Sequence, residues 1–334
     1  MTRHLRTWGT LLLCGFISAS VAGPVAAQGS LRTLTFGLTA KTANEWPEYV
    51  SDKLGFFAAN GIKADIIYTG SSAAGAQQLT AGALDVSEVS STQLIEAVQG
   101  GAPIVAIIEH STKAPYTLVG KKGVNALRDL KGKTIIVGGP NDITRVFTDK
   151  MFGAAKLAPN DYAYTFAGAT SARFAALMNG GVDAAILFPP FSFKAVSLGY
   201  PAIDEVQKYF PSFLFDTFCV QPSWAKTHGD LLVAFGKSYL QGVRWLYNPA
   251  NKARAIQILS EATNTSVEDA SQTYDLFIAK VKIYSTTGLA TAADINPVID
   301  ALVKTGELKP PLPPASKFYD NAYIREANKQ LGRP

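Results

Sequence analysis

Strand-like segments of this chain repeatedly end in turn residues that open a helix. The pattern follows residues 62–68 and 84–89 in the first third, and residues 134–137, 162–166 and 182–187 in the middle third. A β-branched apolar run followed by Gly, Pro, Ser, Thr or Asn is typical of a strand that passes into a helix. Alternating strands and helices predict an α/β architecture with parallel sheets, in which such turns lie along one edge of each sheet.

The clearest of these turns lies in residues 133–144, KTIIVGGPNDIT. We expect a buried strand over residues 134–137, a Gly-Gly-Pro turn, and a helix that begins at Asn141 or Asp142. The start of a helix has unpaired N–H groups and a partial positive charge, which favour an anion or a strong acceptor. Most such turns bind nothing, so the functional argument depends on their repetition.

The two blocks of alternation predict two α/β lobes. We expect residues 120–213 to form a second lobe, inserted into a first lobe made of residues 28–119 and 214–334. The chain would cross between the lobes at residues 116–120 and 213–220. A cleft between facing rows of turns is a common ligand site, and paired crossings suit hinge closure. Helical patterns fill the last third, at about residues 230–247, 249–261, 266–279 and 292–304 and in a final helix that ends near residue 330.

The first 27 residues have the pattern of a secretory signal peptide. Arg3, His4 and Arg6 precede an apolar run at residues 11–21, and small residues lead to a predicted cleavage after Ala27. Removal of this leader leaves about 307 residues, 334 minus 27, which suits one or two domains. No later apolar run approaches the ~20 residues that cross a bilayer. We therefore expect an exported protein that resides in the periplasm.

The two cysteines have different contexts. Leu13 precedes Cys14, where a lipid-attachment signal has a small residue, so we favour soluble export and leave lipidation of Cys14 open. Cys219 is the only cysteine after the predicted cleavage site, which excludes a disulfide within the mature chain. It lies in an apolar run, and we expect it to be a buried small hydrophobic residue rather than a reactive thiol.

Charge and motifs exclude several function classes. Removing Arg3 and Arg6 with the leader lowers the formal charge from +5 to +3, and no Lys/Arg cluster is dense enough for a nucleic-acid partner. The mature chain has only two histidines, His110 and His228, and no GxSxG, HExxH or Cys/His metal cluster. We predict no catalytic residues, no metal and no cofactor.

Several short stretches then carry a family resemblance. They are residues 46–62, with Trp46-Pro47-Glu48-Tyr49-Val50 and a later Gly-Phe-Phe, LTAGALD at 79–85, LKGK at 130–133 and ALMNGGVDA at 176–184. In combination the chain resembles periplasmic solute-binding proteins of ABC importers, in the branch for nitrate, sulfonate, taurine and thiamine-pyrimidine precursors. The resemblance spans about residues 31–222.

The resemblance implies a two-lobe periplasmic binding protein fold of type II. It also implies a monomer that captures a small-molecule solute between its lobes and delivers it to an ABC permease in the inner membrane. The ligand contacts of the family come from the strand-end turns. Carried over by position, the expected ligand-binding residues are Thr39, Asn44, Trp46, Ser71, Ser72, Ser90, Ser91, His110, Asn141, Asp142, Thr144, Thr170, Arg173 and Phe188.

Each of these residues also has an ordinary structural role. The Ser and Thr residues are good helix caps, and Trp46 is either a stacking wall or core packing. His110 ends a buried strand, as a structural or a ligand-contacting histidine. Arg173 suits a carboxylate or sulfonate but can also face solvent. Asp142 caps its helix or receives an amine, and Glu88, unusual on an apolar strand, pairs within the core or marks a polar or cationic ligand group.

The expected solute is a small organic anion or a polar aromatic compound, such as a sulfonate, taurine, a carboxylate or a pyrimidine. Two other functions stay open at this point. One is an exported enzyme that resembles a pyrimidine synthase of the same fold family. The other is an exported ligand-sensing domain, which uses the same liganded cleft to address a signalling partner.

Overall fold

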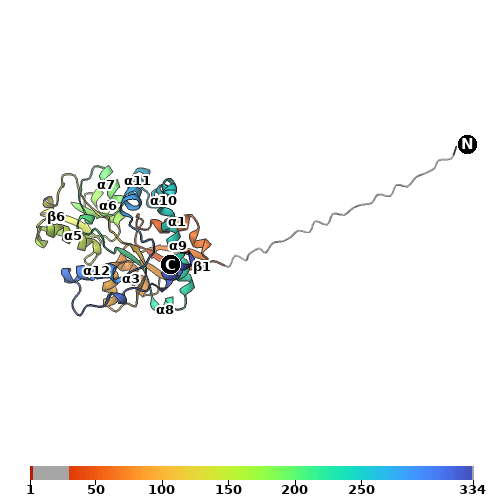
Figure 1. The fold of residues 1–334 in the computed structure, drawn as a ribbon. Helices are drawn as coiled ribbons and strands as arrows, with labels where there is room; N and C mark the ends of the chain where they lie inside the picture. The colour runs from red at the N-terminus through yellow and green to blue at the C-terminus, as the bar shows by residue number, and fades with distance from the viewer. Residues whose placement is uncertain (3–29, 333–334) are drawn as a thin grey trace. The chain divides into compact units, whose positions relative to one another are not determined.

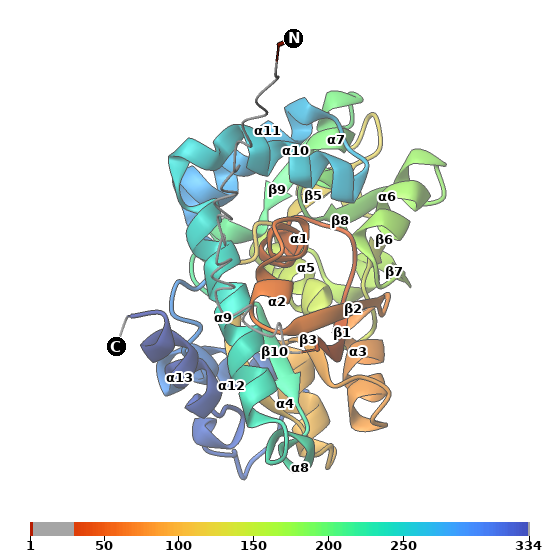
Figure 2. The same ribbon diagram turned by 90° about the vertical axis from the view of Figure 1, so that its right-hand side faces the viewer.

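The computed structural model describes residues 1–2 and 30–332. The expected signal peptide, with Cys14 and the cleavage after Ala27, lies outside the described residues. From Leu31 onward the chain forms one compact unit, which contains two five-stranded sheets (Figure 1). In Figure 2 the strands of the first sheet lie in the lower part of the view and those of the second sheet in the upper part.

The first sheet combines strands from the first third of the chain with one strand from beyond residue 213. Its order is β2-β1-β3-β10-β4. The strands are β1 Arg32–Leu38, β2 Ile62–Tyr68, β3 Val86–Ser90, β4 Val105–Ser111 and β10 Asp216–Val220. Strand β1 runs parallel to β2 and β3, whereas β10 is antiparallel to both β3 and β4.

The second sheet repeats this arrangement with strands from the middle third. Its order is β7-β6-β8-β5-β9. The strands are β5 Thr117–Gly120, β6 Lys133–Val137, β7 Tyr162–Phe166, β8 Ala184–Leu187 and β9 Ala202–Glu205. Strand β6 runs parallel to β7 and β8, and β5 is antiparallel to β8 and β9.

Helices follow most of the parallel strands and fill the last third of the chain. The α-helices are α1 Trp46–Lys53, α2 Phe56–Ala59, α3 Ser72–Thr80, α4 Ser91–Gln99, α5 Ile143–Ala154, α6 Thr170–Met178, α7 Phe191–Ser197, α8 Pro222–Ala225, α9 Gly229–Leu246, α10 Lys252–Thr263, α11 Val267–Tyr274, α12 Ala292–Thr305 and α13 Ala322–Gln330. Short 3-10 turns are η1 Leu127–Leu130, η2 Pro159–Asp161, η3 Val206–Lys208, η4 Pro249–Asn251 and η6 Ala315–Lys317, and η5 Asp275–Val281 is a π-helix.

The α/β class is confirmed, but the expectation of parallel sheets is wrong in one respect. Both sheets are mixed, because β10 and β5 each enter their sheet in the reverse direction. An apolar run shows that a strand is buried and carries no information about its direction. Strand β9 was not predicted from the sequence, because its four residues are short, partly polar and at the sheet edge.

The crossings between the sheets lie slightly earlier in the chain than expected. Strand β5 already belongs to the second sheet from Thr117, and β10 belongs to the first sheet from Asp216. The connecting residues before them run side by side. The N–H of Phe213 donates to the Thr112 carbonyl at 3.1 Å, and the N–H of Phe215 donates to the Ser111 carbonyl at 2.9 Å.

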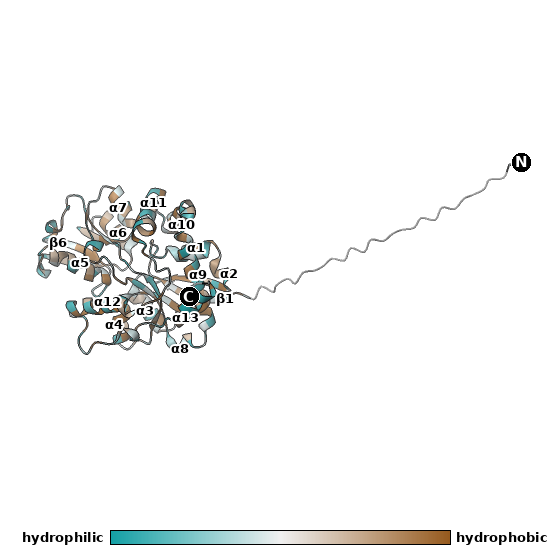
Figure 3. Cartoon of the chain, in the orientation of Figure 1, coloured by the Kyte–Doolittle hydropathy of each residue, from teal (hydrophilic) through white to brown (hydrophobic). Residues whose placement is uncertain are grey.

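The core is formed where helices with one apolar face cover the sheets. Helices α5, α6 and α10 show separate teal and brown patches, as expected for amphipathic helices (Figure 3). In α5 the buried side chains include Phe147, Met151 and Phe152, whereas Lys150 faces solvent. Within residues 30–332, none of the helices combines the length and the apolar character that a membrane span requires.

Helix α9 crosses α1 at a glycine, and this contact leads to a stability prediction. A Cβ at Gly242 would lie 2.5 Å from both the Pro47 carbonyl oxygen and Ser51 Oγ. We expect Gly242→Ala to destabilise the protein by about 1–3 kcal/mol, because backbone has to move. The matched control is Gly153→Ala in α5, which meets nothing within 4 Å and adds up to about 1 kcal/mol of helix stability. Urea unfolding measures both, and equal effects would contradict the close approach.

Candidate functional site

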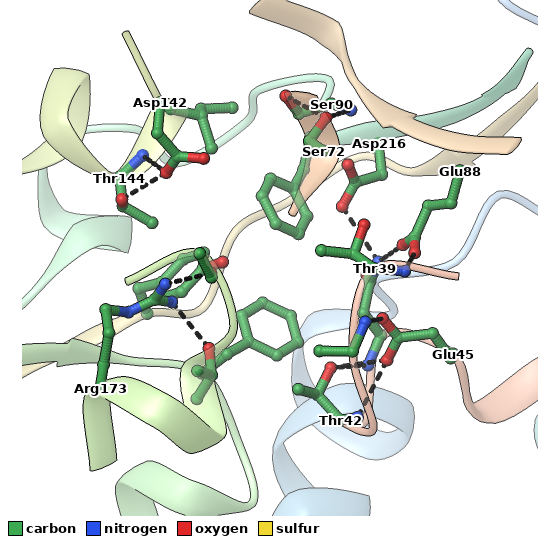
Figure 4. A pocket seen from close by; sticks show the side chains of 18 residues that line it. Thr39, Thr42, Glu45, Ser72, Glu88, Ser90, Asp142, Thr144, Arg173 and Asp216 are labelled. Atoms are coloured by element: carbon green, nitrogen blue, oxygen red, sulfur yellow. Dashed lines mark hydrogen bonds between the residues drawn. The ribbon is translucent and has the colours of Figure 1, made fainter. Parts of the chain in front are cut away.

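A cavity lies between the ends of the two sheets, and both sheets contribute to its walls (Figure 4). Its volume is about 40 Å³, which is room for only a few water molecules. A larger solute therefore enters only after the two walls have moved apart. The lining residues are Thr39, Ala40, Thr42, Asn44, Glu45, Ser72, Glu88, Ser90, Tyr116, Asp142, Ile143, Thr144, Gly168, Thr170, Arg173, Phe188, Phe215 and Asp216.

Starts of helices from both sheets reach this cavity. Ser72 and Ser90 are at the starts of α3 and α4, and Asp142 and Thr170 are at the starts of α5 and α6. On the first-sheet side the Ser90 N–H donates to Ser72 Oγ at 2.7 Å, and the two hydroxyls are 3.1 Å apart. The strand-end turns of the two βα blocks thus meet at one cavity, which places polar side chains from distant parts of the sequence together.

The first-sheet wall is a network of carboxyl groups held by the loop after β1. Glu45 accepts from the Thr42 N–H at 3.0 Å and from the Thr42 hydroxyl at 2.7 Å. Glu88 accepts from the Thr39 N–H at 2.7 Å. The amide nitrogen of Asn44 donates to Glu88 and, at 3.0 Å, to Asp216. One amide therefore joins two carboxyl groups that come from neighbouring strands.

The second-sheet wall contains Asp142, Thr144 and Arg173. The Thr144 N–H donates to Asp142 Oδ1 at 2.9 Å, and the Gly138 N–H donates to the Thr144 hydroxyl at 2.8 Å. A Cβ at Gly138 would lie 2.3 Å from Asp142 Oδ1, so glycine is needed for this carboxylate to fold against the chain. Figure 4 shows Asp142, Thr144 and Arg173 across the cavity from Glu88 and Asp216.

Aromatic rings close the cavity at the connections between the sheets. Tyr116 and Phe188 are 4.8 Å apart between ring centroids, and Phe188 stacks on Phe215 at 5.6 Å. Burial raises the pKa of the Tyr116 phenol, so this group stays a neutral hydrogen-bond donor and acceptor. These rings form an apolar wall opposite polar groups, which suits a solute with one flat or apolar side.

Burial perturbs the carboxyl groups of the cavity. It raises the pKa of Glu45 well above the usual 4.5, and neighbouring Glu88 adds to the effect. Burial likewise raises the pKa of Glu88, although the positive charge of His110 opposes this. For Asp216, burial and then the nearby Glu88 and Asp142 charges raise the pKa well above 3.8. Like-charged groups crowded into a cleft are common at functional sites.

The structure places most of the sequence-predicted residues in this cavity. These are Thr39, Asn44, Ser72, Ser90, Asp142, Thr144, Thr170, Arg173 and Phe188. Their role as ligand contacts stays a prediction. Tyr116, Gly168, Phe215 and Asp216 also line the cavity but were not among the predicted residues. For Asp216 a signal was available, since it is the one charged residue in the apolar run FLFDTFCV.

The other predicted residues lie outside the cavity lining. Trp46 is buried, and its Nε1–H donates to the Ala255 carbonyl at 3.1 Å. Ser71 caps α3 by accepting from the Ala74 N–H at 3.1 Å, and the Ser91 hydroxyl donates to the Leu214 carbonyl at 2.5 Å. His110 is fully buried beside Glu48, and Asn141 is exposed.

The thiol of Cys219 and the arrangement of possible metal ligands both bear on chemistry at this site. Cys219 is buried, as expected, and burial raises the pKa of its thiol to about 12, so it is not a nucleophile. Within residues 30–332, no group of three or more His, Cys, Asp or Glu side chains is arranged to hold a metal ion.

A family model described as NMT1/THI5 like matches residues 42–253. The periplasmic nitrate-binding protein NrtA from Synechocystis PCC 6803 has a similar structure, with a TM-score of 0.77, 14% identity, and coverage of 91% of this chain and 90% of NrtA. The alkanesulfonate-binding protein SsuA from Xanthomonas axonopodis pv. citri, bound to MOPS, gives a TM-score of 0.72, 14% identity, and coverage of 87% and 99%.

The same fold also occurs in an enzyme. The desulfurization enzyme DSZB gives a TM-score of 0.64 at 12% identity, with coverage of 90% of this chain and 99% of the enzyme. At these identities the similarity establishes the fold. A search of curated proteins finds no match to this sequence.

The charge of Asp216 leads to a pH-dependent stability prediction. The pKa of the Asp216 carboxyl is higher in the folded than in the unfolded protein. Its contribution to the free energy of unfolding is therefore fully present below pH 3.8, and this contribution is lost as the pH rises through the pKa of the folded protein. We expect Asp216→Asn to stabilise the ligand-free protein by roughly 1–3 kcal/mol at neutral pH. The gain should vanish as the pH falls toward 3.8.

Urea unfolding at several pH values measures this difference. The matched control is Asp52→Asn, which removes the same charge from an exposed position on α1 and should change stability by less than about 0.5 kcal/mol at every pH. If Asp216→Asn destabilises the protein equally at all pH values, the carboxylate is a structural hydrogen-bond acceptor and its charge does not strain the fold.

Proposed function

This chain belongs to the NMT1/THI5 like family, and from that premise we propose that it is a periplasmic solute-binding protein of an ABC importer. It is exported by a signal peptide cleaved after Ala27, acts as a monomer, and delivers a small solute to an inner-membrane permease. The nitrate- and alkanesulfonate-binding proteins with similar structures support this proposal.

The observation that carries the proposal is the shared cavity. Its walls come from both sheets, and the two sheets are joined by connections that pair with each other near the cavity. We take the first lobe to be residues 28–111 with 216–334 and the second lobe to be residues 117–211, because β5 pairs in the second sheet from Thr117 and β10 in the first from Asp216. Residues 112–116 and 212–215 connect the two lobes. Paired connections next to a ligand site allow hinge closure, in which the solute completes the contacts between two rigid bodies.

The solute is small and polar and carries an aromatic or apolar part. Hydroxyl groups of Thr39, Ser90 and Tyr116 offer hydrogen bonds, and the rings of Phe188 and Phe215 offer a flat surface. The combination of hydroxyl groups and aromatic rings favours a polar aromatic solute, such as a pyrimidine, over a sulfonate or a carboxylate. A closed cavity with little water strengthens each hydrogen bond and sets the orientation of the solute.

Capture is favoured over catalysis for this site. An acid–base or nucleophilic enzyme needs a reactive group that reaches the substrate. The single thiol of the predicted mature chain, Cys219, is buried and protonated, and His110 is buried outside the cavity lining. We therefore propose no chemical conversion, and expect the bound solute to leave unchanged.

Native mass spectrometry of the exported protein, purified without dialysis, tests the proposal. We expect a mass above that of the chain beginning at residue 28, and loss of this excess after partial unfolding and refolding. The released solute, added back, should raise the melting temperature, since a ligand present at 100 times its Kd adds about 2.7 kcal/mol. Absence of any bound solute, together with no melting shift across sulfonates, carboxylates, amines and pyrimidines, would exclude solute capture.

A glycine at the contact between the two sides gives a test of closure. A Cβ at Gly168 would lie 2.4 Å from the carbonyl oxygen of Gly70, on the other side of the cavity. We expect Gly168→Ala to weaken solute binding by roughly tenfold or more, because the walls no longer meet, with little loss of fold stability. Gly181→Ala, whose Cβ would lie 3.5 Å from the Ala176 carbonyl, is the control. Unchanged affinity in Gly168→Ala would show that binding does not need this closed contact.

A further inference from the structure

The cavity has an excess of negative groups. Among the described residues, four carboxyl side chains line it, from Glu45, Glu88, Asp142 and Asp216, against a single guanidinium from Arg173. An anionic solute would have to enter this field, and within the same part of the chain its direct cationic partner in the lining is Arg173. A solute can bind only those groups whose hydrogen-bonding atoms the protein itself leaves unused.

Arg173 is largely used by the protein itself. Its Nε donates to the Ile186 carbonyl at 2.8 Å, and Nη1 donates to the Ala167 carbonyl at 2.9 Å and to the Gly168 carbonyl. Its Nη2 donates to the Thr170 hydroxyl at 2.7 Å. The side chain is 1% exposed. Arg173 thus organises the loop before α6, and little of its hydrogen-bonding capacity points to an anion.

Two of the carboxyl groups are also used internally. Glu45 Oε1 accepts from the Ala40 N–H at 3.3 Å, and Oε2 accepts from Thr42. Glu88 accepts on one oxygen from Thr39 and on the other from Asn44. Both glutamates therefore hold the loop after β1 against the sheet.

Asp142 and Asp216 each keep one oxygen free. Asp142 accepts through Oδ1 from Thr144, and Asp216 accepts through Oδ2 from Asn44. In the part of the chain that the structure describes, the second oxygen of each has no hydrogen-bond partner. The two residues come from opposite sides of the cavity, as Figure 4 shows.

Asn44 provides an independent sign of an absent partner. Its side chain lines the cavity and is 4% exposed. Its Nδ2 is fixed by Glu88 and Asp216, and its Oδ1 is a buried acceptor without a hydrogen-bond partner in the described chain. A buried acceptor left without a donor destabilises the protein, because it has lost its hydrogen bonds to water. The unused groups at this site are thus mainly acceptors, and they require a donor.

We propose that the solute carries a protonated nitrogen group, an amine or an amidine, which donates hydrogen bonds to Asp142 and Asp216 and links the two sides of the cavity. This inference rests on the proposed function and specifies the solute class for the same site. The rings of Tyr116, Phe188 and Phe215 then contact the apolar part of the solute. The neighbouring binding proteins for nitrate and alkanesulfonate take anions, so the specificity of this chain is of the opposite charge.

The cation also explains how the solute drives closure. In the empty protein, closing the cavity brings Asp142 and Asp216 toward each other and concentrates like charges in a poorly hydrated space. A solute cation between them turns this repulsion into two attractions. A solute of the correct charge therefore stabilises the closed state, whereas an anion of the same shape does not.

Two matched pairs of probes test the sign of the charge. Benzamidine and benzoate have the same size and opposite charge, and acetamidine and acetate form a smaller pair. We expect benzamidine and acetamidine to raise the melting temperature at low salt and to bind at least roughly tenfold more tightly than the matching carboxylates. Calorimetric titration provides the dissociation constants.

Two substitutions and a control assign the effect to the cavity. Asp142→Asn keeps a good helix cap, and Asp216→Asn keeps an acceptor for Asn44, so both variants should fold. We expect each to weaken amidine binding by roughly 30-fold or more, and to leave benzoate binding unchanged or improved. Asp52→Asn removes an exposed charge on α1 and should leave both affinities unchanged.

Other outcomes overturn this inference. Binding of benzoate or an alkanesulfonate without binding of the amidines would show an anion site, and solute capture itself would stand. An equal loss of amidine binding in Asp52→Asn would show nonspecific charge attraction. A larger melting shift with Ca²⁺ or Zn²⁺, lost in Asp142→Asn, would show that a metal ion occupies the site. Absence of amidine binding also refutes the inference, while the mass-spectrometric search for a co-purified solute decides solute capture separately.

Discussion

The reversed strand in each sheet is the constraint on which the cavity depends. Because β10 is antiparallel to β3, its first residue, Asp216, pairs with Ser90 at the last position of β3. Strand β5 is reversed in the same way, so Thr117 pairs with Leu187 at the end of β8. The chain must therefore enter both sheets at the edge where the parallel strands end. Both connections, the strand-end turns and the cavity between them consequently meet at one place.

The same arrangement buries carboxyl groups at the cavity, and their burial destabilises the fold. Three neighbouring carboxyl groups on the first-sheet side are removed from water, and burial raises the pKa of each. Hydrogen bonds from the loop after β1 offset part of this cost, since Glu45 and Glu88 accept from backbone N–H groups and Asn44 bridges Glu88 to Asp216. Sites that break the rules of core composition at the expense of stability are where function is expected. Asp142, held against the chain at Gly138, presents a further carboxylate from the other side.

Local signals in the sequence predicted the elements well and the connections between them less well. The turn after β6 and its cap at Asp142 follow from neighbouring residues, and the structure has both. Strand direction depends on tertiary pairing, so the reversal of β10 and β5 was not predictable from an apolar run. For the same reason the aromatic wall of Tyr116 and Phe215, which lie about 100 residues apart, has no local signature. The hydroxyl-rich turns gave most of the polar lining, whereas Trp46 shows that a helix start can point its side chain into the core.

His110 shows how a residue outside the cavity acts on it. The histidine is fully buried on β4, and its Nε2 is 3.4 Å from Glu48 Oε1, a distance that pairs charges although neither atom has a hydrogen-bond partner in the described chain. Burial alone would lower the pKa of His110, but the charges of Glu48 and Glu88 raise it above 6.5. The resulting positive charge in turn lowers the pKa of Glu88 against the effect of burial. The positive charge of His110, which lies behind the cavity wall, thus favours the ionised form of Glu88. A neutral residue at position 110 would make Glu88 easier to protonate. His110, expected from the sequence as a structural or a ligand-contacting residue, lies fully buried outside the cavity lining, and its charge acts on the cavity wall through Glu88.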